Sequence, residues 1–343
     1  MRKNFLFGLA VLMVSFFVLS CSKEDDSSKE TGKKSEIVKE ENSKEEETPN
    51  QGDSNSSDNN SNQENNSGEN NNQDNNSSEN NDGTNNEEGE SSSKMFVYKV
   101  LVEDITGTWC PNCPRVTHTI ENMKRVSHIN ERVVPVAIHS EGEYRNYDPM
   151  AIDQERPIYN YYKRATGDLN LTGLPYFAKN RKQRLYASNA LENIDTYLTQ
   201  NKTSPIGIKI SSELNDKGGK VTVNLKFKEN YSNLKYTVYV IENKIIYEQR
   251  NSTHLYGGGY LRTFEHNDVL RAIYGETMGN SLGSVKKGEE VIKKDLQLNY
   301  SLLSAGKLSN VKVVVFVSDA TTNEVLNVQE AKANETKDYQ YAE

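Results

Sequence analysis

The sequence predicts an α/β domain followed by an all-β domain, both behind a disordered N-terminal tether. Three observations predict this order. Residues 22–94 contain no aromatic residue and only two branched aliphatic ones, too little apolar surface to offset the entropy of folding. From residue 95 a strand pattern, a Cys-x-x-Cys motif and a helix pattern follow one another. From Ser204 onward, short segments of alternating apolar and polar residues are separated by turn signals.

The first 20 residues are typical of a secretory signal peptide. Arg2 and Lys3 precede an apolar run that is shorter than the ~20 residues needed to span a bilayer as a helix. The run ends at Ser20 and Cys21, an arrangement that resembles the lipobox of bacterial lipoproteins. The resemblance implies that Cys21 is lipidated and joins the protein to the membrane. The alternative is an ordinary signal peptide with an incidental cysteine.

Residues 21–94 are expected to form a flexible spacer. Segment 22–94 carries 20 acidic residues against seven lysines, a net charge of −13, and the leader adds +2. The whole chain has a net charge of −8, so residues 95–343 carry +3. A mildly positive globule lacks the strong basic patch of a nucleic-acid-binding protein, and no nucleic-acid partner is expected.

The start of the spacer also contains a possible localisation signal. The run Lys23-Glu24-Asp25-Asp26, just behind the expected lipid anchor, resembles the surface-export signal of Bacteroidetes lipoproteins. It implies attachment to the outer membrane and exposure at the cell surface. A tether that simply begins with charged residues is the alternative, so the periplasmic face stays open.

Cysteine usage narrows the chemistry. With Cys21 taken by lipid, Cys110 and Cys113 remain as a single pair. In an oxidising cell envelope, scattered cysteines indicate structural disulfides, whereas a lone Cys-x-x-Cys pair indicates redox or metal chemistry.

A buried strand is expected over residues 95–105, and a helix after the cysteines. Pro111 suits the first position of that helix, which places Cys110 at its N-terminus. The helix macrodipole favours a thiolate there and lowers the thiol pKa. Cys113 would lie one turn further on, less exposed and within disulfide reach. Cys110 is therefore the expected attacking thiol and Cys113 the resolving one.

Strand, Asp104, Trp109-Cys110-x-x-Cys113 and helix together resemble the redox segment of the thioredoxin superfamily. The resemblance covers residues 95–202 and implies a thioredoxin-like α/β domain. It implies that Asp104 is a buried acid that helps move the proton of the resolving thiol. Glu103 competes with Asp104 for the inward face of the strand.

The same resemblance identifies a second loop of the site. Leu174-Pro175 looks like the cis-proline loop of thioredoxins, so Pro175 would be cis. Leu174 would offer backbone groups to an extended substrate, and Trp109 is the other expected substrate-binding residue. The remaining elements of the domain are expected as a strand at 132–139, a helical insert at 150–166, a hairpin at 176–187 and a helix at 189–200.

Other chemistries fit the motif less well. Zinc could use Cys110, Cys113, His118 and His139, but two cysteines with two scattered histidines give a weak metal signal. Covalent haem needs a histidine directly after the second cysteine, and Pro114 stands there. No metal and no cofactor are therefore expected.

Residues 203–334 are predicted to form an immunoglobulin-like β-sandwich, and residues 335–343 a disordered tail. A long excursion, 246–287, is rich in Gly and Tyr and contains His266-Asn267-Asp268. It is expected to be a recognition surface, a lid over the Cys-x-x-Cys motif, or a loop packed on its own sandwich. The expected strands are 206–214, 220–228, 235–242, 291–298, 311–319 and 324–330.

This order of modules, with the histidine stretch in the loop, resembles the Bacteroidetes outer-membrane lipoproteins named for a twenty-eight-kilodalton member. The functional hypothesis is a membrane-anchored thiol–disulfide oxidoreductase of the cell envelope. Its partners would be envelope or surface proteins that carry thiols or disulfides. The alternative is a surface binding or adhesion lipoprotein in which the disulfide is structural.

Overall fold

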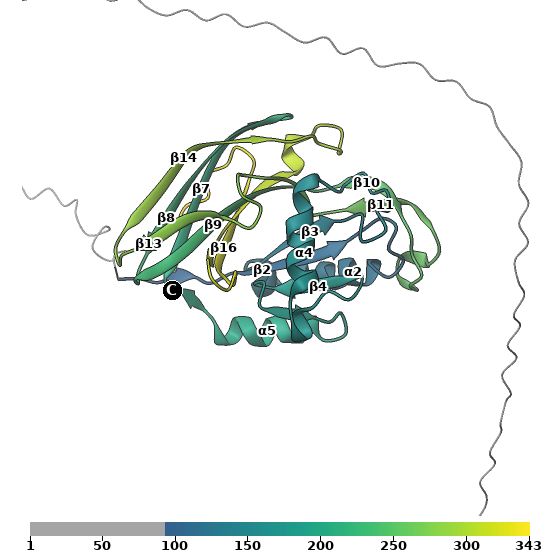
Figure 1. Ribbon diagram of the computed structural model, residues 1–343, viewed down its shortest axis with the longest axis horizontal. Helices are drawn as coiled ribbons and strands as arrows, with labels where there is room; N and C mark the ends of the chain where they lie inside the picture. The colour runs from purple at the N-terminus through teal and green to yellow at the C-terminus, as the bar shows by residue number, and fades with distance from the viewer. Residues whose placement is uncertain (1–92) are drawn as a thin grey trace, which may run out of the picture. The chain divides into compact units, whose positions relative to one another are not determined.

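The computed structural model describes residues 93–343 (Figure 1). The signal peptide, Cys21 and nearly all of the expected tether lie outside the described residues. Within the described range, no helix is both long and apolar enough to cross a membrane.

A nine-stranded sheet organises the described part of the chain. Its strands run in the order β16-β15-β9-β12-β3-β2-β4-β5, and β13 pairs with β9 beside this path. β3 is parallel to both β2 and β12, whereas the other pairs are antiparallel. The strands are β2 (Val100–Thr106), β3 (Val133–His139), β4 (Tyr176–Lys179), β5 (Gln183–Leu185), β9 (Tyr231–Glu242), β12 (Val269–Ile273), β13 (Asn280–Val285), β15 (Val311–Asp319) and β16 (Val325–Lys332).

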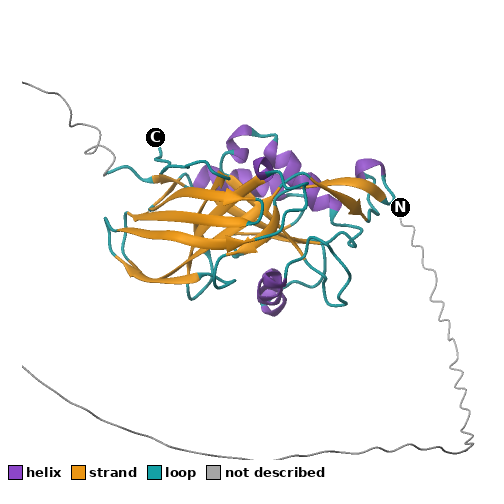
Figure 2. Ribbon diagram, turned by 90° about the horizontal axis from the view of Figure 1, so that it is seen from above, coloured by secondary structure: helices purple, strands orange, loops and turns teal. Residues whose placement is uncertain are grey.

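Helices cover both faces of this sheet at the β2–β3–β4 end (Figure 2). On one face, α2, α3 and α5 pack on Val100 and Val102. On the other, α4 packs on Leu101 and Ile105 through its buried aromatic and aliphatic residues. Because successive side chains of β2 point to opposite faces of the sheet, alternate residues of this strand pack into two different cores. The helices are α2 (Pro114–Lys124), α3 (Ser127–Asn130), α4 (Arg156–Arg164) and α5 (Ala190–Gln200), with short 3-10 turns η1 (Asp153–Glu155), η2 (Gly167–Leu169), η3 (Leu255–Gly257) and η4 (Leu308–Asn310).

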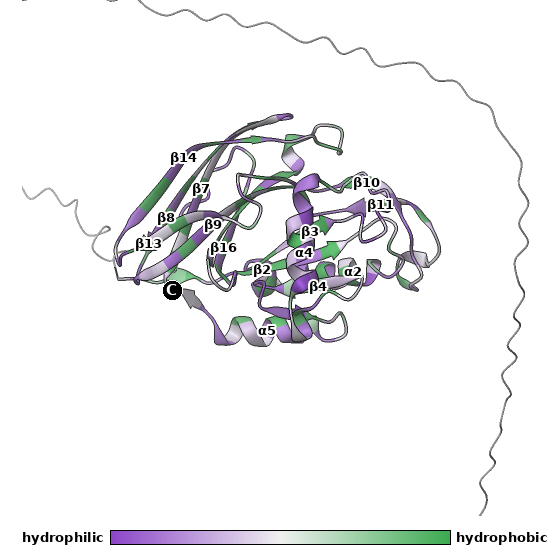
Figure 3. Cartoon of the chain, in the orientation of Figure 1, coloured by the Kyte–Doolittle hydropathy of each residue, from purple (hydrophilic) through white to green (hydrophobic). Residues whose placement is uncertain are grey.

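At the other end of the sheet a β-sandwich forms. A three-stranded sheet of β7 (Ile206–Asn215), β8 (Gly218–Phe227) and β14 (Glu290–Asn299) packs on β9 and β15. Alternating residues such as Val221, Val223 and Leu225 of β8 meet Val313 and Val315 of β15 in an apolar core. Figure 3 shows apolar segments along these strands. The six strands expected in this half are all present.

The predicted fold class is wrong. The described residues are mostly β, with 43% in strands and 19% in helices. No thioredoxin-like α/β core stands apart from a separate sandwich, because strands from both halves of the chain share the nine-stranded sheet. β12 makes the connection: it lies between β9 and β3, and Leu270 and Ile273 join one cluster with Leu101 and Val136. The expected boundary at residue 202 is thus crossed by hydrogen-bonded sheet.

The excursion that supplies β12 is itself structured. It contains the hairpin of β10 (Ile245–Gln249) and β11 (Leu261–His266), followed by β12 and β13. The five residues of β12 are all buried, so they show no alternation that would mark a half-exposed strand. For this reason the sequence pattern predicted a long loop over residues 246–287 and no strand at β12.

Residues 335–343, expected to form a disordered tail, contact other parts of the described chain. Lys337 exchanges backbone hydrogen bonds with Ile210, and Ala342 donates to Met95. The rings of Tyr339 and Tyr341 lie 5.8 and 5.0 Å from the ring of Phe96, between ring centroids. Two short strands, β1 (Phe96–Val97) and β6 (Thr203–Ser204), pair beside this contact. Aromatic packing thus holds a segment whose polar composition suggested a free end.

Candidate functional site

Cys110 and Cys113 form a disulfide in front of helix α2. The helix begins at Pro114, with Cys113 as its N-cap, and not at Pro111 as the sequence predicted. Proline has no N–H, so Pro114 cannot donate to the carbonyl of Cys110 and the regular helical ladder starts after it. Cys113 therefore lies at the helix N-terminus and Cys110 one turn ahead of it.

Both cysteines are buried. Cys110 is 2% exposed and Cys113 1%, so the expected difference in exposure is absent from this oxidised state. A segment from the far half of the chain covers the motif: residues 249–256, which we call the strap. The backbone N–H groups of Arg250 and Ser252 donate to the carbonyls of Thr108 (2.8 Å) and Pro111 (2.7 Å). The strap therefore lies along the backbone of the cysteine loop.

Side chains of the strap strengthen this contact. The amide Nε2 of Gln249 donates to the carbonyls of Gly107 and Cys110, at 3.2 and 2.9 Å. At its other end, the hydroxyl of Tyr256 donates to Glu121 of α2 at 2.7 Å, and its ring meets His118 edge-on. Residues 249–256 of excursion 246–287 thus cover the motif, whereas β12 and β13 of the same excursion pair with β9.

Trp109 fixes the opposite side of the loop. Its indole Nε1 donates to the carbonyl of Ser140 at 2.9 Å. The ring lies so close to Gly107 and Gly142 that a Cβ at either position would come within 3.0 Å of it. Trp109 is half-buried and joins the loops at the ends of β2 and β3, so part of its surface remains for a substrate.

A histidine–aspartate pair, His139 and Asp148, holds the backbone of the cysteine loop. His139, at the end of β3, contacts Asp148 through Nδ1 at 2.9 Å, and Asp148 also accepts the backbone N–H of Thr108 at 2.8 Å. Burial opposes the charge of Asp148, but His139 and the N–H groups of Thr108 and Met150 outweigh it and lower its pKa to about 2. The ionised carboxylate of Asp148 thus holds the backbone N–H of Thr108, the residue before Trp109.

Asp104 and Glu103 divide between the two faces of β2. Asp104 lies on the α2 side, 2% exposed, and its Oδ1 has no hydrogen-bond partner among residues 93–343. Burial raises its pKa well above the usual carboxyl range. Glu103 lies on the opposite face, where it pairs with Arg181. Of the two acids, Asp104 is therefore the one on the face of β2 that α2 covers.

Leu174 and Pro175 precede β4, and the peptide bond between them is cis, as expected. Ile105 pairs with Tyr176 in the antiparallel β2–β4 ladder. Pro175 is therefore opposite Thr106, at the end of the sheet where the chain leaves β2 toward Trp109. The substrate-binding roles of Leu174 and Trp109 stay predictions.

The residues considered for zinc do not come together as a ligand set. Both cysteines are in the disulfide, His139 is held by Asp148, and His118 lies on α2 against the strap. Among residues 93–343, no three His, Cys, Asp or Glu side chains are grouped so that they could hold a metal ion.

Sequence reasoning missed several residues of the site. Gln249, Asp148 and Ser252 carry no motif of their own, and only the tertiary fold brings them to the cysteine loop. For His266 the sequence predicts only a share in a recognition surface or a lid over the motif. Its ring centroid lies 5.3 Å from that of His139, and burial, with the neighbouring His139, lowers its pKa to about 3.

Comparisons with known proteins match this chain to one protein family and to solved structures. A family model described as outer membrane protein Omp28 matches residues 162–337. The structure is similar to HBP35 of Porphyromonas gingivalis, with a TM-score of 0.53, 17% identity, and coverage of 71% of this chain and 77% of that one. A protein of Agrobacterium tumefaciens matches with a TM-score of 0.45, 15% identity, and coverage of 70% and 97%. No curated protein matches the sequence.

Proposed function

We propose that this chain, which belongs to the outer membrane protein Omp28 family, exchanges thiols and disulfides with other proteins through Cys110 and Cys113. The observation that carries the proposal is the disulfide between these two residues at the start of α2, with the buried acid Asp104 on the neighbouring strand. The chain is an outer membrane protein, and its partners would be envelope or surface proteins with thiols or disulfides.

The proposed exchange follows from the chemistry of the pair. In the reduced protein, the Cys110 thiolate attacks one sulfur of a substrate disulfide and the other substrate sulfur leaves as a thiolate. Asp104, once it has released its own proton, takes the proton of Cys113, and the Cys113 thiolate attacks Cys110, which restores the Cys110–Cys113 disulfide and releases the second substrate thiolate. Two electrons pass from the cysteine pair to the substrate. With an oxidised pair and a substrate dithiol, the same steps run in reverse.

Cys110 is assigned the first attack because of its position. It lies one turn ahead of the helix start, in the loop between Trp109 and the strap, whereas Cys113 is the N-cap and is held beneath it. The unpaired N–H groups and positive end of α2 favour a thiolate in this region. Since Cys110 is buried under the strap in the oxidised state, the substrate gains access when the strap moves.

Reactivity and trapping test the proposal. In the reduced full-length protein, Cys110 should react with iodoacetamide with an apparent pKa clearly below the ~8.5 of a free thiol. Cys113→Ala should accumulate mixed disulfides with envelope proteins, and Cys110→Ala, the matched control, should accumulate none. An unreactive Cys110 together with no trapped partners in Cys113→Ala would overturn the proposal.

Attachment through lipid on Cys21 is the second part of the proposal. It rests on the lipobox resemblance and on the outer-membrane family to which the chain belongs. The wild type should incorporate labelled palmitate and sediment with outer membranes, and Cys21→Ser should do neither. Cys110→Ser is the matched control and should behave as the wild type. Membrane sedimentation of unlabelled Cys21→Ser at the wild-type level would contradict a lipid anchor at this residue.

One observation favours a second candidate function. Both sulfur-bearing residues are almost fully buried, as in structural disulfides, which suits a surface binding protein whose Cys110–Cys113 bond only staples the loop. Under this reading the oxidised form resists reduction, and the alanine variants lose stability without trapping partners. The experiment above therefore separates the two candidates.

A further inference from the structure

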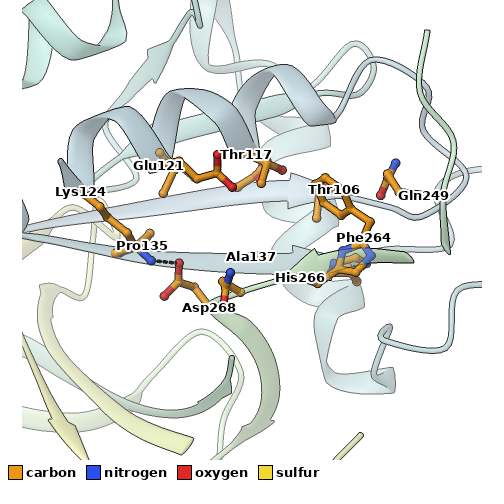
Figure 4. A pocket seen from close by; sticks show the side chains of 14 residues that line it. Thr106, Thr117, Glu121, Lys124, Pro135, Ala137, Gln249, Phe264, His266 and Asp268 are labelled. Atoms are coloured by element: carbon orange, nitrogen blue, oxygen red, sulfur yellow. Dashed lines mark hydrogen bonds and ion pairs between the residues drawn. The ribbon is translucent and has the colours of Figure 1, made fainter. Parts of the chain in front are cut away.

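A cavity of about 80 Å³ lies beneath α2, next to the cysteine loop (Figure 4). Its roof is one side of α2, with Thr117 and Glu121, and its floor is formed by β2, β3 and the end of β11. In Figure 4, His266 and Phe264 lie at one end and the Lys124–Asp268 ion pair at the other. A water molecule needs about 10–15 Å³ of such volume, so the cavity has room for several.

Three side-chain atoms in the wall of this cavity lack hydrogen-bond partners among the described residues. They are Oδ1 of Asp104, Nε2 of His266 and Oδ1 of Asp268, on residues that are 2%, 5% and 4% exposed. A buried polar atom left unpaired costs about 1–3 kcal/mol. Three such atoms around one cavity with room for water indicate that water is their common partner.

The sheet register and one ring contact place Asp104 and His266 on the wall of the same cavity. Asp104 is opposite Ala137 in the β2–β3 ladder, and Thr106 is opposite His139. His139 in turn stacks edge-on with His266. Asp104 and His139 are therefore one strand and two residues apart on this face, and His266 lies beyond His139 on the wall of the same cavity.

The two groups also have complementary hydrogen-bonding roles. Backbone hydrogen bonds with Tyr247 and Glu248 act to raise the pKa of His266, so the ring donates to this backbone. Nε2 has no partner among the described residues, which leaves Nδ1 as the donor. Burial holds the ring neutral, since it lowers the pKa of His266 to about 3. Nε2 is therefore a lone-pair acceptor directed at the cavity. Burial raises the pKa of Asp104 and so favours its protonated form, whose carboxyl group can donate to a water.

The other charged groups around the cavity are engaged elsewhere. Lys124 and Asp268 pair with each other, and Asp148 is held by His139 and Thr108. Glu121, at the rim on α2, accepts the hydroxyl of Tyr256 from the strap. Asp268 keeps an unpaired Oδ1, but its Oδ2 binds Lys124 at the other end of the cavity, so Asp104 and His266 are the pair that we consider for a bridging water.

We propose that Nε2 of His266 holds a cavity water against Asp104, and that this water is the route by which Asp104 exchanges its proton with solvent. The inference rests on the proposed function, in which Asp104 receives the proton of Cys113 as the Cys110–Cys113 bond forms. Asp104 first releases its own proton to this water, which passes it toward the rim; as a carboxylate it then accepts the proton of Cys113, so that it is protonated again in the oxidised protein. His266 touches no sulfur and is a positioning residue.

Single-turnover kinetics test this role. Reduced wild type, mixed with glutathione disulfide, should form the Cys110–glutathione bond and resolve it quickly. His266→Leu removes the acceptor, and we expect the resolving step to slow about tenfold or more, with the initial attack unchanged. His266→Gln retains an acceptor and should recover most of the rate. His128→Gln, on an exposed histidine, is the matched control and should not change either step.

A spectroscopic readout separates this inference from the proposed function. The infrared C=O band of protonated Asp104 in the oxidised protein, assigned with Asp104→Asn, should have the frequency of a hydrogen-bonded acid. It should move to that of a free acid in His266→Leu. A wild-type band at the free-acid frequency would overturn the inference, and this measurement does not depend on how well His266→Leu folds. The inference would also fail if His266→Leu changed neither the rate of the resolving step nor the Asp104 band. If wild type forms no mixed disulfide but the band shifts as expected, the proposed function fails and the bound water stands.

Discussion

Glu103 and Asp104 are adjacent in the chain, yet they lie on opposite faces of β2 and in opposite electrostatic settings. Glu103 accepts two hydrogen bonds from Arg181, at 2.9 and 2.8 Å, and one from the hydroxyl of Tyr162 at 2.7 Å. Tyr239 completes the network as the partner of Arg181. Asp104 has an unpaired oxygen and a cavity beside it. The paired acid holds the fold together, whereas the unpaired acid is available for proton transfer.

The largest expected effect comes from breaking the paired side. Arg181→Met leaves the charge of Glu103 buried without its partner, and we expect a loss of about 3–5 kcal/mol in the free energy of unfolding by urea. The double variant Glu103→Leu/Arg181→Met should recover most of this loss, because it removes both charges. Arg125→Met, at an exposed position, should change stability by less than about 0.5 kcal/mol. A loss below about 1 kcal/mol in Arg181→Met would mean that the pair is not structural.

The unpaired side should respond in the opposite direction. Since burial raises the pKa of Asp104, the unfolded chain releases this proton first, and stability falls as pH rises from about 3.8 toward the raised value. Asp104→Asn removes that titration. The oxidised variant should therefore be more stable than wild type at neutral pH, by about 1.4 kcal/mol for each pH unit of the window. The gain should vanish near pH 4, in urea unfolding at a series of pH values.

Two outcomes decide this prediction. Asp153→Asn, at an exposed position before α4, is the matched control and should follow the wild-type pH profile. If Asp104→Asn is less stable than wild type at neutral pH, Asp104 is a charged, stabilising group in the folded protein and the comparison with Glu103 is wrong.

Loosening the strap should have the smallest effect. Ser252→Pro removes the N–H that donates to the carbonyl of Pro111, a hydrogen bond worth about 0.5–1.5 kcal/mol. The disulfide should then be reduced by dithiothreitol about two- to tenfold faster. Ser252→Ala keeps the N–H and should be reduced at the wild-type rate. Equal rates for both variants would show that the strap does not control access to Cys110.

The parts of the molecule that sequence reasoning predicted are those set by local pattern. Alternation along β7 and β8 predicted both strands, and the contiguous Trp109-Cys110-x-x-Cys113 motif predicted the disulfide. The fold class failed because it depends on β12, whose fully buried residues show no alternation and whose partner β3 lies more than 100 residues away. Non-local pairing of this kind leaves no trace in a window of the sequence.

The site was predictable to the same extent. Asp104 was found because it stands six residues before Cys110 in a strand. Its environment was not, because Gln249, His266 and Asp268 reach the cavity only through the β10–β11 hairpin and the turn that leads into β12. Glu103 and Asp104 could not be separated from sequence alone, since their faces depend on which helices cover β2.

The central claim is that the Cys110–Cys113 disulfide is exchanged and not merely structural. Its reduction potential tests this most directly, measured on the full-length protein by equilibration in dithiol buffers and quantified by mass spectrometry of the alkylated cysteines. We expect a value between about −120 and −270 mV, the range of proteins that exchange disulfides. A value below about −300 mV, typical of structural disulfides, would contradict the claim.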